Sequence, residues 1–444
     1  MDFRVIYLPI GVGTFHLESA RAQFDRSVSC LRQAEPSVIC PQDMLLSVDA
    51  LCDFLSDKQA DLAVVQNLTF ANAAYISEVI HRLDCPVLLW TLREPVIDGT
   101  RLRLNSLTGA FSAANTMHLC GRSFSYVFGT PDEARVQDGI RAVLSAARVR
   151  HAMRSLRLLQ VGHTPQGFGF GRALDAEMLR TFGVRLESVE ARELIETARS
   201  YSDEEIRTYL DDAGSRIRGL SDLPEGNVLD FARLYKAYAS YVQTHGIGAL
   251  ASRCWPDFFT AFGTPVCAVL SILNDLGIPG ACEADAYGAL SMFVAARMTE
   301  QSVFFGDPVS LDEKENTITF WHCGMAPCSL AREDTGACAG VHCNRKIGPT
   351  LEFGCKASPE VTIFRIGRQA DGSFRFFAAR GEAPDKPQQF YGVSTVVRTQ
   401  SPARSLVESA VQNGWEPHFV VAYGDIVQAL EALGRMLDIP VELF

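Results

Sequence analysis

The stretch ADLAVVQNLTFANAAYISEVIHRLDCPVLLWTL, residues 60–92, decides the fold class. Residues 60–70 and 85–92 are apolar runs of strand length, and residues 73–84 between them have the apolar spacing of an amphipathic helix. Strand, helix and strand in this order are typical of a crossover between two parallel strands. The stretch therefore predicts a parallel α/β sheet.

The same alternation extends toward both ends of the chain. It predicts a strand over 3–12, a helix over 17–33 and, after a basic switch near residue 155, a strand over 156–163 and a helix over 173–182. After about residue 315, short β-like runs with turn residues replace the alternation. We therefore expect an α/β protein with two doubly wound parallel-sheet domains at 1–155 and 156–315, and a smaller β-rich, barrel-like domain with a closing helix at 316–444.

Composition and charge exclude several classes of protein. Of 444 residues, 47% are hydrophobic and 21% charged, and the net charge is −11, which argues against a nucleic-acid partner held through its phosphates. No apolar run approaches the roughly 18 residues of a membrane-spanning helix. The start, MDFRVIYLPIGVG, lacks the features of a secretory signal. With that start, thirteen cysteines favour reduced thiols, and we expect a cytoplasmic protein.

Polar and aromatic residues follow several of the expected strands. In open parallel sheets, ligands bind beyond the carboxyl ends of the strands. Structural packing or capping is an equally good alternative for each of these residues. The candidates for binding substrate hydroxyls are Gln66, Asn67, Trp90, Arg93, Trp255 and Asn274.

The densest polar group lies in GIPGACEADAYGAL, residues 277–290. Glu283 and Asp285 are two apart, so an extended backbone would project both carboxylates to one side. Two close carboxylates raise the pKa of one of them or bind a divalent cation. The alternative is a helix cap with acids favoured by the helix dipole. The spacing alone does not choose between the two.

Three further candidates lie near strand ends: Asp307 in VFFGDPVSLD, His322 in TFWHCGMAPC and His418 in GWEPHFVVAYGD. The alternatives are a turn residue for Asp307 and hydrogen-bonded structural histidines. Carboxylates with imidazoles suit manganese, magnesium or a related divalent ion better than a thiolate site does. A rival hypothesis is structural zinc, although the cysteine spacing is not the usual tight pairing, with Cys323, Cys328, Cys338, His342 and Cys343 as ligands.

At these motifs the chain resembles the L-fucose isomerase and L-arabinose isomerase superfamily. The likeness runs from CWPDFF through PVCAVLSILNDLGIPGACEADAYGALSM, FFGDP, TFWHCGMAP, FGCKASPEVTIFRIG and EPHFVVAYGD, and extends weakly over the N-terminal part. It implies two α/β domains and a smaller β-rich domain. It also implies aldose–ketose isomerisation with a divalent metal, commonly Mn²⁺ with Mg²⁺ or Co²⁺ as alternatives, in a homo-oligomer with active sites near subunit interfaces.

The resemblance also implies roles for individual residues. Glu283 matches the acid of the arabinose branch, and Asp285 is closer to that of the fucose branch. Asp307 resembles the second acid of the arabinose branch, His322 its first ligand histidine, and His418 the C-terminal ligand histidine of both branches. The implied catalytic acid–base pair is Glu283 and Asp307, and the implied metal ligands are Glu283, Asp285, Asp307, His322 and His418.

One departure from the family pattern bears on the substrate. The fucose branch has a glutamate ligand upstream, where this chain reads GTPVCAV with Cys267. We therefore expect another monosaccharide than L-fucose: a pentose, hexose, deoxyhexose, or an acidic or sulfonated hexose, isomerised through an enediolate.

Arg345, in HCNRKIG, is a candidate for binding an anionic substituent of the sugar, because an arginine fork suits sulfonate or phosphate. Surface solvation is its alternative. For the whole chain, the alternative function is that of a non-catalytic sugar-binding or regulatory relative, since a fold alone does not give activity.

Overall fold

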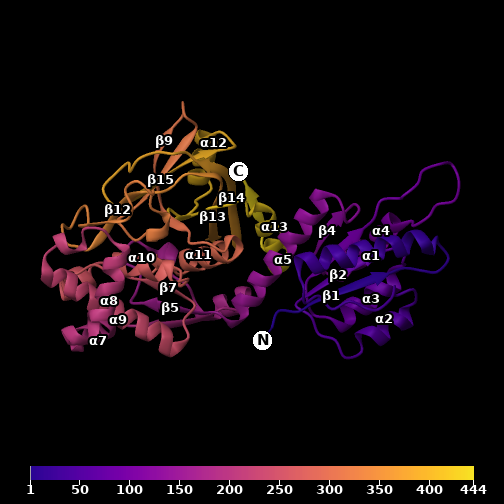
Figure 1. The fold of residues 1–444 in the computed structure, drawn as a ribbon, viewed down its shortest axis with the longest axis horizontal. Helices are drawn as coiled ribbons and strands as arrows, with labels where there is room; N and C mark the ends of the chain where they lie inside the picture. Colours follow the sequence, from indigo (N-terminus) through magenta and orange to yellow (C-terminus); the bar gives the residue numbers. More distant parts are fainter. Residues whose placement is uncertain (1) are drawn as a thin grey trace. The chain divides into compact units, whose positions relative to one another are not determined.

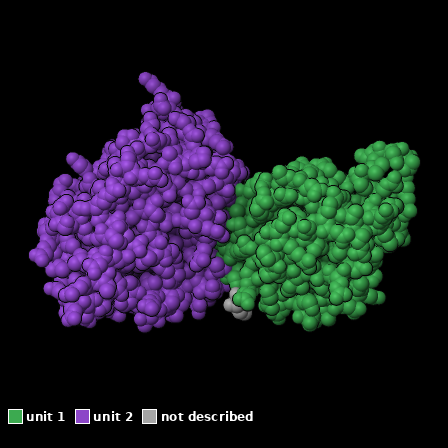
Figure 2. All heavy atoms as spheres, viewed as in Figure 1, with its two compact units in different colours: residues 1–151, 428–439 green, residues 152–427, 440–444 purple. Residues whose placement is uncertain are grey.

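The computed structural model describes residues 2–444 and divides the chain into two compact units. The first unit comprises Met1–His151 and Gln428–Ile439, and the second comprises Ala152–Val427 and Pro440–Phe444 (Figure 2). Within residues 2–444, no helix is long and apolar enough to cross a membrane. The domain boundaries after residues 155 and 315 stay a prediction.

The first unit is built on a four-stranded parallel sheet of order β1-β2-β3-β4 (Figure 1). The strands predicted over 3–12, 60–70 and 85–92 are confirmed with shorter bounds, and β4 lies in a stretch for which the sequence predicted no strand. The strands are β1 (Val5–Ile10), β2 (Leu62–Asn67), β3 (Val87–Thr91) and β4 (Phe124–Phe128). The helices are α1 (Leu17–Ala34), α2 (Val48–Leu55), α3 (Ala73–Arg82), α4 (Ser106–Leu119) and α5 (Ala134–Ser155).

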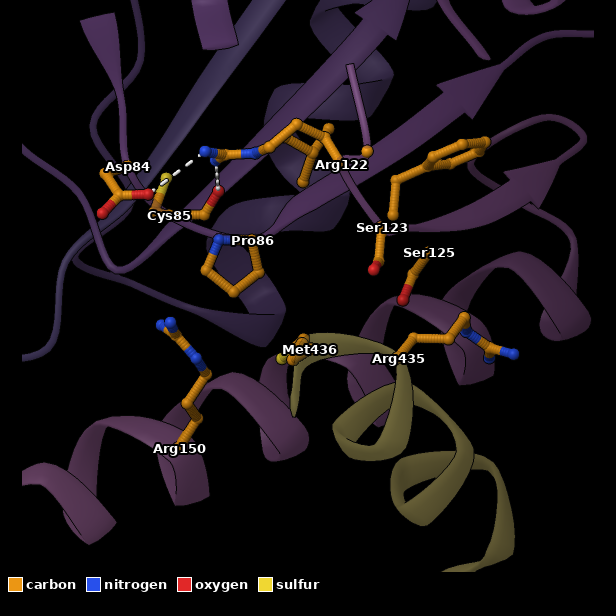
Figure 3. Close-up of a pocket in the computed structure, with 12 residues that line it drawn as sticks. Asp84, Cys85, Pro86, Arg122, Ser123, Ser125, Arg150, Arg435 and Met436 are labelled. Carbon is orange, nitrogen blue, oxygen red and sulfur yellow. Dashed lines mark hydrogen bonds and ion pairs between the residues drawn. The ribbon is translucent and has the colours of Figure 1, made fainter. Parts of the chain in front are cut away.

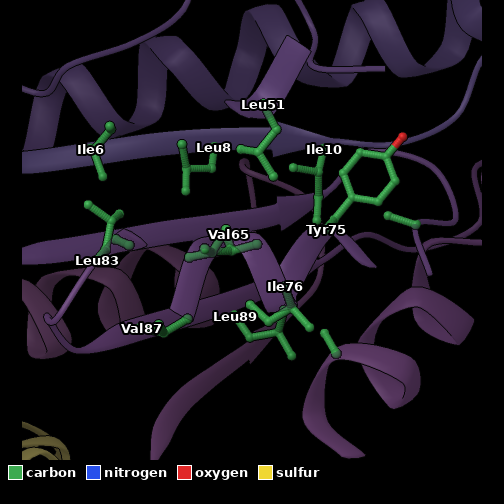
Figure 4. Packing of buried hydrophobic residues seen from close by; sticks show 14 of the residues in the cluster. Ile6, Leu8, Ile10, Leu51, Val65, Tyr75, Ile76, Leu83, Val87 and Leu89 are labelled. Carbon is green, nitrogen blue, oxygen red and sulfur yellow. The ribbon is translucent and has the colours of Figure 1, made fainter. Parts of the chain in front are cut away.

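Helices cover both faces of this sheet because successive strand residues point to opposite sides. On one face, alternate residues of the strands, such as Leu8 and Val65, pack in one apolar cluster with Leu51 of α2 and Ile76 of α3 (Figure 4). On the other face, the ring of Tyr7 stacks on Phe24 of α1, with ring centroids 6.2 Å apart. The first unit is therefore doubly wound, as predicted.

The closing helix of the chain, α13 (Val427–Leu437), belongs almost entirely to the first unit. It is followed by β17 (Val441–Leu443), which pairs in parallel with a strand of the second unit. A segment from the far end of the sequence thus completes the packing of the first α/β unit.

The second unit begins with another parallel sheet, of order β6-β5-β7-β8. Ser202 caps α8 with Glu205 in a capping box. The helix predicted over 173–182 is a short α6 continued by a π-helical turn, Met178–Phe182. The elements are β5 (Arg157–Val161), α6 (Asp175–Glu177), β6 (Arg185–Val189), α7 (Ala191–Ser200), α8 (Asp203–Arg216), α9 (Glu225–His245), β7 (Ala249–Ser252), α10 (Cys267–Asp275), β8 (Gly280–Cys282) and α11 (Ala286–Thr299).

The rest of the second unit is a largely antiparallel sheet that closes on itself. Its order is β11-β12-β15-β10-β9-β16-β13-β14-β17, and the extra pairing of β15 with β14 joins six of these strands into a barrel, as predicted. The elements are β9 (Phe304–Asp312), β10 (Thr317–His322), β11 (Cys338–Gly340), β12 (Thr350–Gly354), β13 (Ser358–Arg368), β14 (Phe374–Ala383), β15 (Val393–Thr399), α12 (Ala403–Gln412) and β16 (Phe419–Ala422).

Helix α11 joins the two parts of the second unit. Its residues 286–295 are all buried, and it contacts β7 and β8 of the parallel sheet as well as β13 and β16 of the barrel. A helix that is apolar on all sides is stable only when it is covered on all sides. This placement brings the start of α11 next to the barrel strands, where the acidic motif can meet residues from the C-terminal part of the chain.

Candidate active site

The acidic motif forms a strained turn between β8 and α11. Glu283 and Ala284 have φ angles of 59° and 56°, which residues other than glycine adopt rarely. Asp285 is the N-cap of α11, and its Oδ1 accepts a hydrogen bond from the backbone N–H of Gly288 at 2.8 Å. The helix-cap alternative is therefore correct for Asp285, whereas Glu283 stands before the helix. Backbone strain of this kind gathers at functional sites.

Three strands of the barrel bring the other candidates to the same place. His322 ends β10, Asp307 lies in β9, and His418 directly precedes β16. Strand β9 pairs with both neighbours, so that Asp307 lies opposite Trp321 and Gly306 lies opposite Phe419. This register sets the two histidines on either side of Asp307.

His418 is the centre of the site. Its Nε2 lies 3.0 Å from Oε2 of Glu283 and 3.6 Å from Oδ1 of Asp307, and its Nδ1 lies 2.9 Å from Oδ2 of Asp285. The imidazole is buried, which by itself lowers its pKa, but the hydrogen bonds to Asp285 and Glu283 outweigh burial and raise the pKa to about 9. Residues far apart in the sequence thus form one charge network.

Asp285 is held from behind by Arg365, a fully buried residue of β13. The guanidinium donates from Nη1 to Oδ2 at 2.6 Å and from Nη2 to Oδ1 at 3.1 Å. Burial alone would raise the pKa of Asp285, but Arg365 and His418 outweigh it and hold this pKa well below its usual range. Both oxygens are engaged by Arg365 and His418, an arrangement typical of a carboxylate that orients a histidine ligand, and the role of Asp285 as a metal ligand stays a prediction.

The sequence analysis did not identify Arg365, although a signal was present. In EVTIFRIG the arginine lies within an apolar strand. A charged side chain at such a position must either be buried with a partner of opposite charge or point away from the core. What the sequence could not give was the partner, which lies 80 positions away.

Glu283, His322 and His418 can converge on one metal ion. Each offers one donor atom, and these atoms lie within 4.8 Å of one another. Burial lowers the pKa of His322 to about 4, which keeps this imidazole neutral and ready to ligate, whereas a metal on Nε2 of His418, whose pKa is about 9, would have to displace the proton there. Burial would raise the pKa of Glu283, but the hydrogen bond with His418 and the nearby His322 lower it. Among residues 2–444 no other group of three such side chains converges in this way, so the rival hypothesis of a cysteine-rich zinc site is not supported.

Asp307 lies beside this group with a partly exposed side chain. Its carboxyl is 33% exposed, and its contact with His418 is the longest of the three that this imidazole makes with acids. Burial raises its pKa to about 6, with Glu283 and Asp285 adding to the rise and His418 opposing it. A carboxyl with this pKa can both accept and return a proton near neutral pH.

Aromatic rings enclose the site. Phe170 meets the ring of His418 edge-on with centroids 5.2 Å apart, and Phe305 lies 4.9 Å from the same ring. Phe170 belongs to the loop after β5, where a Cβ on Gly171 would come within 2.8 Å of Cα of Asp285. Phe170 lies in the GFGFG run, 167–171, and the sequence analysis did not identify it as a residue of the site. The signal that could have identified it is the position of the GFGFG run after the carboxyl end of a strand, where parallel sheets bind their ligands.

Trp255 and Arg345 form one edge of the site. The indole Nε1 of Trp255 donates to Oε1 of Glu283 at 3.2 Å. The guanidinium carbon of Arg345 lies 5.2 Å from the ring centroid of Trp255 and 4.9 Å from that of Phe259. Nη1 of Arg345 lies 3.4 Å from Nε2 of His342, and in the described part of the chain no carboxylate pairs with Arg345. The arginine is oriented by aromatic faces and keeps an uncompensated charge.

Three of the four candidates in the first unit have hydrogen-bond partners for their side chains inside that unit. Gln66 accepts from the hydroxyl of Tyr7 and donates to Oγ of Ser27 at 3.0 Å. Asn67 is fully buried and its amide has no hydrogen-bond partner among residues 2–444, Trp90 Nε1 donates to Gly129 O at 3.0 Å, and Arg93 forms a two-pronged ion pair with Glu133. The contact of these four residues with substrate stays a prediction.

Two residues near the acidic motif are held inside the second unit. The amide of Asn274 bonds to both backbone groups of Gly280, accepting at 2.7 Å and donating at 3.3 Å, and so holds the start of β8, while its contact with substrate stays a prediction. Cys267, where the fucose branch has an upstream acid, is fully buried in the first turn of α10. The three converging donors therefore form without a carboxylate at that position.

Comparison with known proteins gives consistent relatives. The family model of the L-fucose isomerase C-terminal domain matches residues 322–444. A sulfoquinovose isomerase from Clostridium sp. (strain MSTE9) is 58% identical over 100% of this chain and 99% of its own length. Sulfoquinovose isomerases from Priestia aryabhattai and Alkalicoccus urumqiensis are 36% and 35% identical, the former over 99% of both chains and the latter over 98%. A solved solute-binding protein from Agrobacterium vitis, bound with α-D-tagatopyranose, aligns at 13% identity over 68% of this chain and 91% of its own, with a TM-score of only 0.17.

The site and these relatives define an enzyme class: the chain is a ketol-isomerase that interconverts aldoses and ketoses, and its substrate is a sugar. Within this class it belongs to the fucose isomerase-like family, as its motifs predicted. The alternative of a non-catalytic sugar-binding relative is therefore not supported.

Proposed function

We propose that this chain is a metal-dependent isomerase of a sulfonated hexose, with sulfoquinovose, a glucose that carries a sulfonate on C6, as its substrate. The observation that carries the proposal is the convergence of Glu283, His322 and His418 beside the half-exposed Asp307. The substrate comes from the names of relatives aligned over nearly the whole chain. The homo-oligomer and the cytoplasmic location stay predictions.

The three donor side chains fit a divalent ion. One carboxylate oxygen and two imidazole nitrogens suit Mn²⁺, with Co²⁺ or Mg²⁺ as alternatives. When bound, such an ion polarises the oxygens on C1 and C2 of the sugar and makes the C2 proton more acidic. Asp285 and Arg365 orient His418 for this task, because Asp285 fixes its Nδ1 and leaves Nε2 toward Glu283.

Asp307 is the group that we assign to proton transfer. As a carboxylate it takes the proton from C2 of the aldose, which gives an enediolate, and it returns a proton to C1 while the hydroxyl proton moves from O2 to O1. A pKa of about 6 leaves it mostly ionised at neutral pH yet basic enough to hold the proton between the two steps. Glu283, predicted as the other member of the acid–base pair, has a lowered pKa and serves better as a ligand.

The aromatic rings protect this transfer. Phe170 and Phe305 pack against His418, and Phe168 packs edge-on against Trp255 with centroids 5.8 Å apart. Apolar walls keep bulk water from the enediolate and strengthen the interactions between charged groups inside the site.

Arg345 is the residue that we assign to the sulfonate. Its side chain is exposed, its guanidinium is held between two aromatic rings, and it is linked through Trp255 to Glu283. Burial, and then the charge of Arg345, lower the pKa of His342 to about 4, so the neighbouring imidazole adds no second cation. A planar fork without a carboxylate partner is suited to bind a sulfonate with two hydrogen bonds.

The first experiment removes and restores the metal. The purified protein is treated with chelator, reloaded with Mn²⁺ and incubated with sulfoquinovose in deuterated water. We expect ketose with deuterium at C1 only in the reloaded sample, and an Asp307→Asn variant that binds Mn²⁺ but is about 10³-fold slower. Turnover that persists after metal analysis finds the sample empty would contradict the metal, and ketose without deuterium would contradict exchange through Asp307.

The second experiment tests the assignment of Arg345. Arg345→Gln should lower kcat/KM for sulfoquinovose about 30-fold, the usual effect of losing a charged hydrogen-bonding partner, and leave 6-deoxyglucose within about threefold. Arg253→Gln is a matched control, since Arg253 is nearby but already paired with Asp257 at 2.7 Å. An equal loss on both sugars would show that Arg345 is structural.

A further inference from the structure

The loop between β11 and β12 places two nitrogen atoms side by side: Nε2 of His342 lies 3.4 Å from Nη1 of Arg345. We infer that both nitrogens donate to one oxygen of the sulfonate, which makes His342 a second specificity-determining residue for the anionic group of the substrate. The inference rests on the proposed function, in which Arg345 binds the sulfonate, and adds a donor that the proposed function does not contain.

Backbone groups of the loop fix the tautomer of His342. Its Nδ1 faces the backbone N–H of Asn344 at 3.3 Å and that of Arg345 at 3.4 Å. Both groups are donors, so Nδ1 is the nitrogen that accepts and carries no hydrogen. A neutral imidazole has one hydrogen on its two ring nitrogens, and in His342 it is therefore on Nε2.

The other protonation states of His342 are less favourable. A hydrogen on Nδ1 would oppose two backbone N–H groups, whereas a hydrogen on Nε2 opposes one donor, Nη1 of Arg345. Burial, and then the charge of Arg345, lower the pKa of His342 to about 4, so the doubly protonated ring is rare near neutral pH. Two N–H donors thus meet without an acceptor between them.

The missing acceptor points to an oxyanion. His342 is 1% exposed, and among residues 2–444 the one polar contact of its Nε2 is with Arg345. A buried donor without an acceptor costs free energy. An oxygen placed between the two nitrogens would accept from both, and its negative charge would balance that of the guanidinium. Because Arg345 is exposed, such an oxygen can reach the pair from the side of the solvent.

One aromatic ring holds both donors. The ring of Phe259 meets that of His342 edge-on with centroids 5.0 Å apart, and the guanidinium carbon of Arg345 lies 4.9 Å from the centroid of the same phenylalanine. Backbone hydrogen bonds close the loop: the N–H of His342 donates to the carbonyl of Ile347 at 2.9 Å, and that of Lys346 donates to the carbonyl of His342 at 2.8 Å. Donors held in this way lose little freedom when a ligand binds, which lowers the entropic cost of binding.

An arginine of the first unit shows the contrast. Arg122 lines a cavity of about 190 Å³ beside β3 and β4 (Figure 3). Its Nη1 donates to Oδ1 of Asp84 at 3.1 Å, and its Nη2 donates to the carbonyl oxygen of Cys85 at 3.2 Å. That guanidinium has acceptors within its own unit, whereas the side-chain neighbour of the Arg345 guanidinium is a second donor. The pair at His342 and Arg345 therefore lacks an acceptor that a bound anion would supply.

The test uses two variants of His342 in the full-length protein loaded with Mn²⁺. Asparagine can place its carbonyl oxygen near the position of Nδ1 but has no donor at Nε2, whereas the amide of glutamine reaches the position of Nε2 and donates there. We expect His342→Asn to lower kcat/KM for sulfoquinovose about tenfold, through KM, and to leave 6-deoxyglucose within about twofold. His342→Gln should stay within about threefold of the parent on both sugars.

Two comparisons separate this inference from the proposed function. Arg345→Gln is measured beside the His342 variants, and His245→Asn, in α9 with its ring stacked on Tyr241, is the matched control and should change neither sugar. A selective loss on sulfoquinovose in Arg345→Gln but not in His342→Asn would overturn the inference and leave the proposed function intact. An equal loss on both sugars in His342→Asn would show a structural role, and no selective loss in either variant would overturn both.

A measurement without turnover tests the tautomer directly. The ring nitrogens of histidine are labelled with ¹⁵N for NMR, and the signals of His342 are identified by their loss in His342→Gln. We expect a hydrogen on Nε2 and none on Nδ1 at neutral pH. The Nε2 signal should shift when sulfoquinovose, but not 6-deoxyglucose, is added to the Glu283→Gln protein. A hydrogen on Nδ1, or an Nε2 signal that sulfoquinovose does not move, would overturn the inference.

Discussion

At the carboxyl end of the first sheet, Gln66 and Arg93 find partners inside the fold, whereas at the corresponding end of the second sheet Glu283 and Asp285 converge with residues of the barrel. Gln66 makes neutral hydrogen bonds, and Arg93 forms an ion pair with Glu133. Glu283 and Asp285 instead face His418, and the pKa of this histidine is raised to about 9. The two regions have similar sequence signals and different chemistry.

The difference teaches where to look for function in a parallel sheet. A strand end predicts the place of a polar residue, but its chemistry depends on whether partners nearby use all its hydrogen-bonding capacity. In the first unit they do, for Gln66 and Trp90. In the second unit the barrel adds His322, His418 and Asp307, and the donors of the first two converge with that of Glu283.

The largest effect should come from Glu283→Gln. This change removes the carboxylate of the donor group, and we expect loss of bound Mn²⁺ and a fall in kcat of at least about 10³-fold. Glu133→Gln is the matched control in the first unit and should leave kcat within twofold. If both variants kept full activity, the contrast between the two sheet ends would be wrong.

Arg365→Leu should give the next largest effect, on stability. It leaves Asp285 buried with His418 as its remaining charged partner, and breaking a buried pair in this way costs about 3–5 kcal/mol. The measurement is the free energy of unfolding by urea in the metal-free protein. The double variant Arg365→Leu/Asp285→Leu should recover part of the loss, and a single variant as stable as the parent would contradict the role of this pair.

Gln66→Leu should destabilise the first unit and leave catalysis unchanged. It deprives Tyr7 and Ser27 of their buried partner, at a cost of about 1–3 kcal/mol. Urea unfolding and kcat/KM are measured on the same preparation. A lowered kcat/KM with unchanged stability would restore Gln66 as a substrate-binding residue.

The smallest effect is a pH dependence at Glu133. Hydrogen bonds from Arg93, and then from the backbone of Thr130, lower its pKa to about 2. Because the folded pKa lies below the unfolded one, the stability that this group contributes is present above pH 4.5 and is lost as the pH falls toward 2. Glu133→Gln should therefore cost about 1 kcal/mol at pH 7, after screening by solvent, and the difference should narrow below pH 4.5 and close only near pH 2. A difference that does not change with pH would show that the charge of Glu133 contributes nothing.

Local pattern was enough for most of the architecture. Apolar periodicity was sufficient to predict the strands over 62–67 and 87–91 and the helix over 73–82. A helix that buries one face and a parallel strand that is buried on both faces each have a characteristic spacing of apolar residues. β4 was missed because FSYVF is short and half-exposed, so its pattern lacks a continuous apolar run. The short π-helical turn at 178–182 was missed as well, because its residues are compatible with an ordinary helix.

By itself the sequence determined the α/β class, the barrel-like C-terminal sheet and the candidate acids and histidines, because periodicity and motifs are local properties. Only the tertiary structure decided which of these residues act together. It joined Asp285 to Arg365, directed Glu283 toward His418, and gave Gln66 a partner in Ser27. The physical reason is that a pKa and a hydrogen-bond balance depend on neighbours within a few ångströms, and in this chain those neighbours are as many as 135 positions apart.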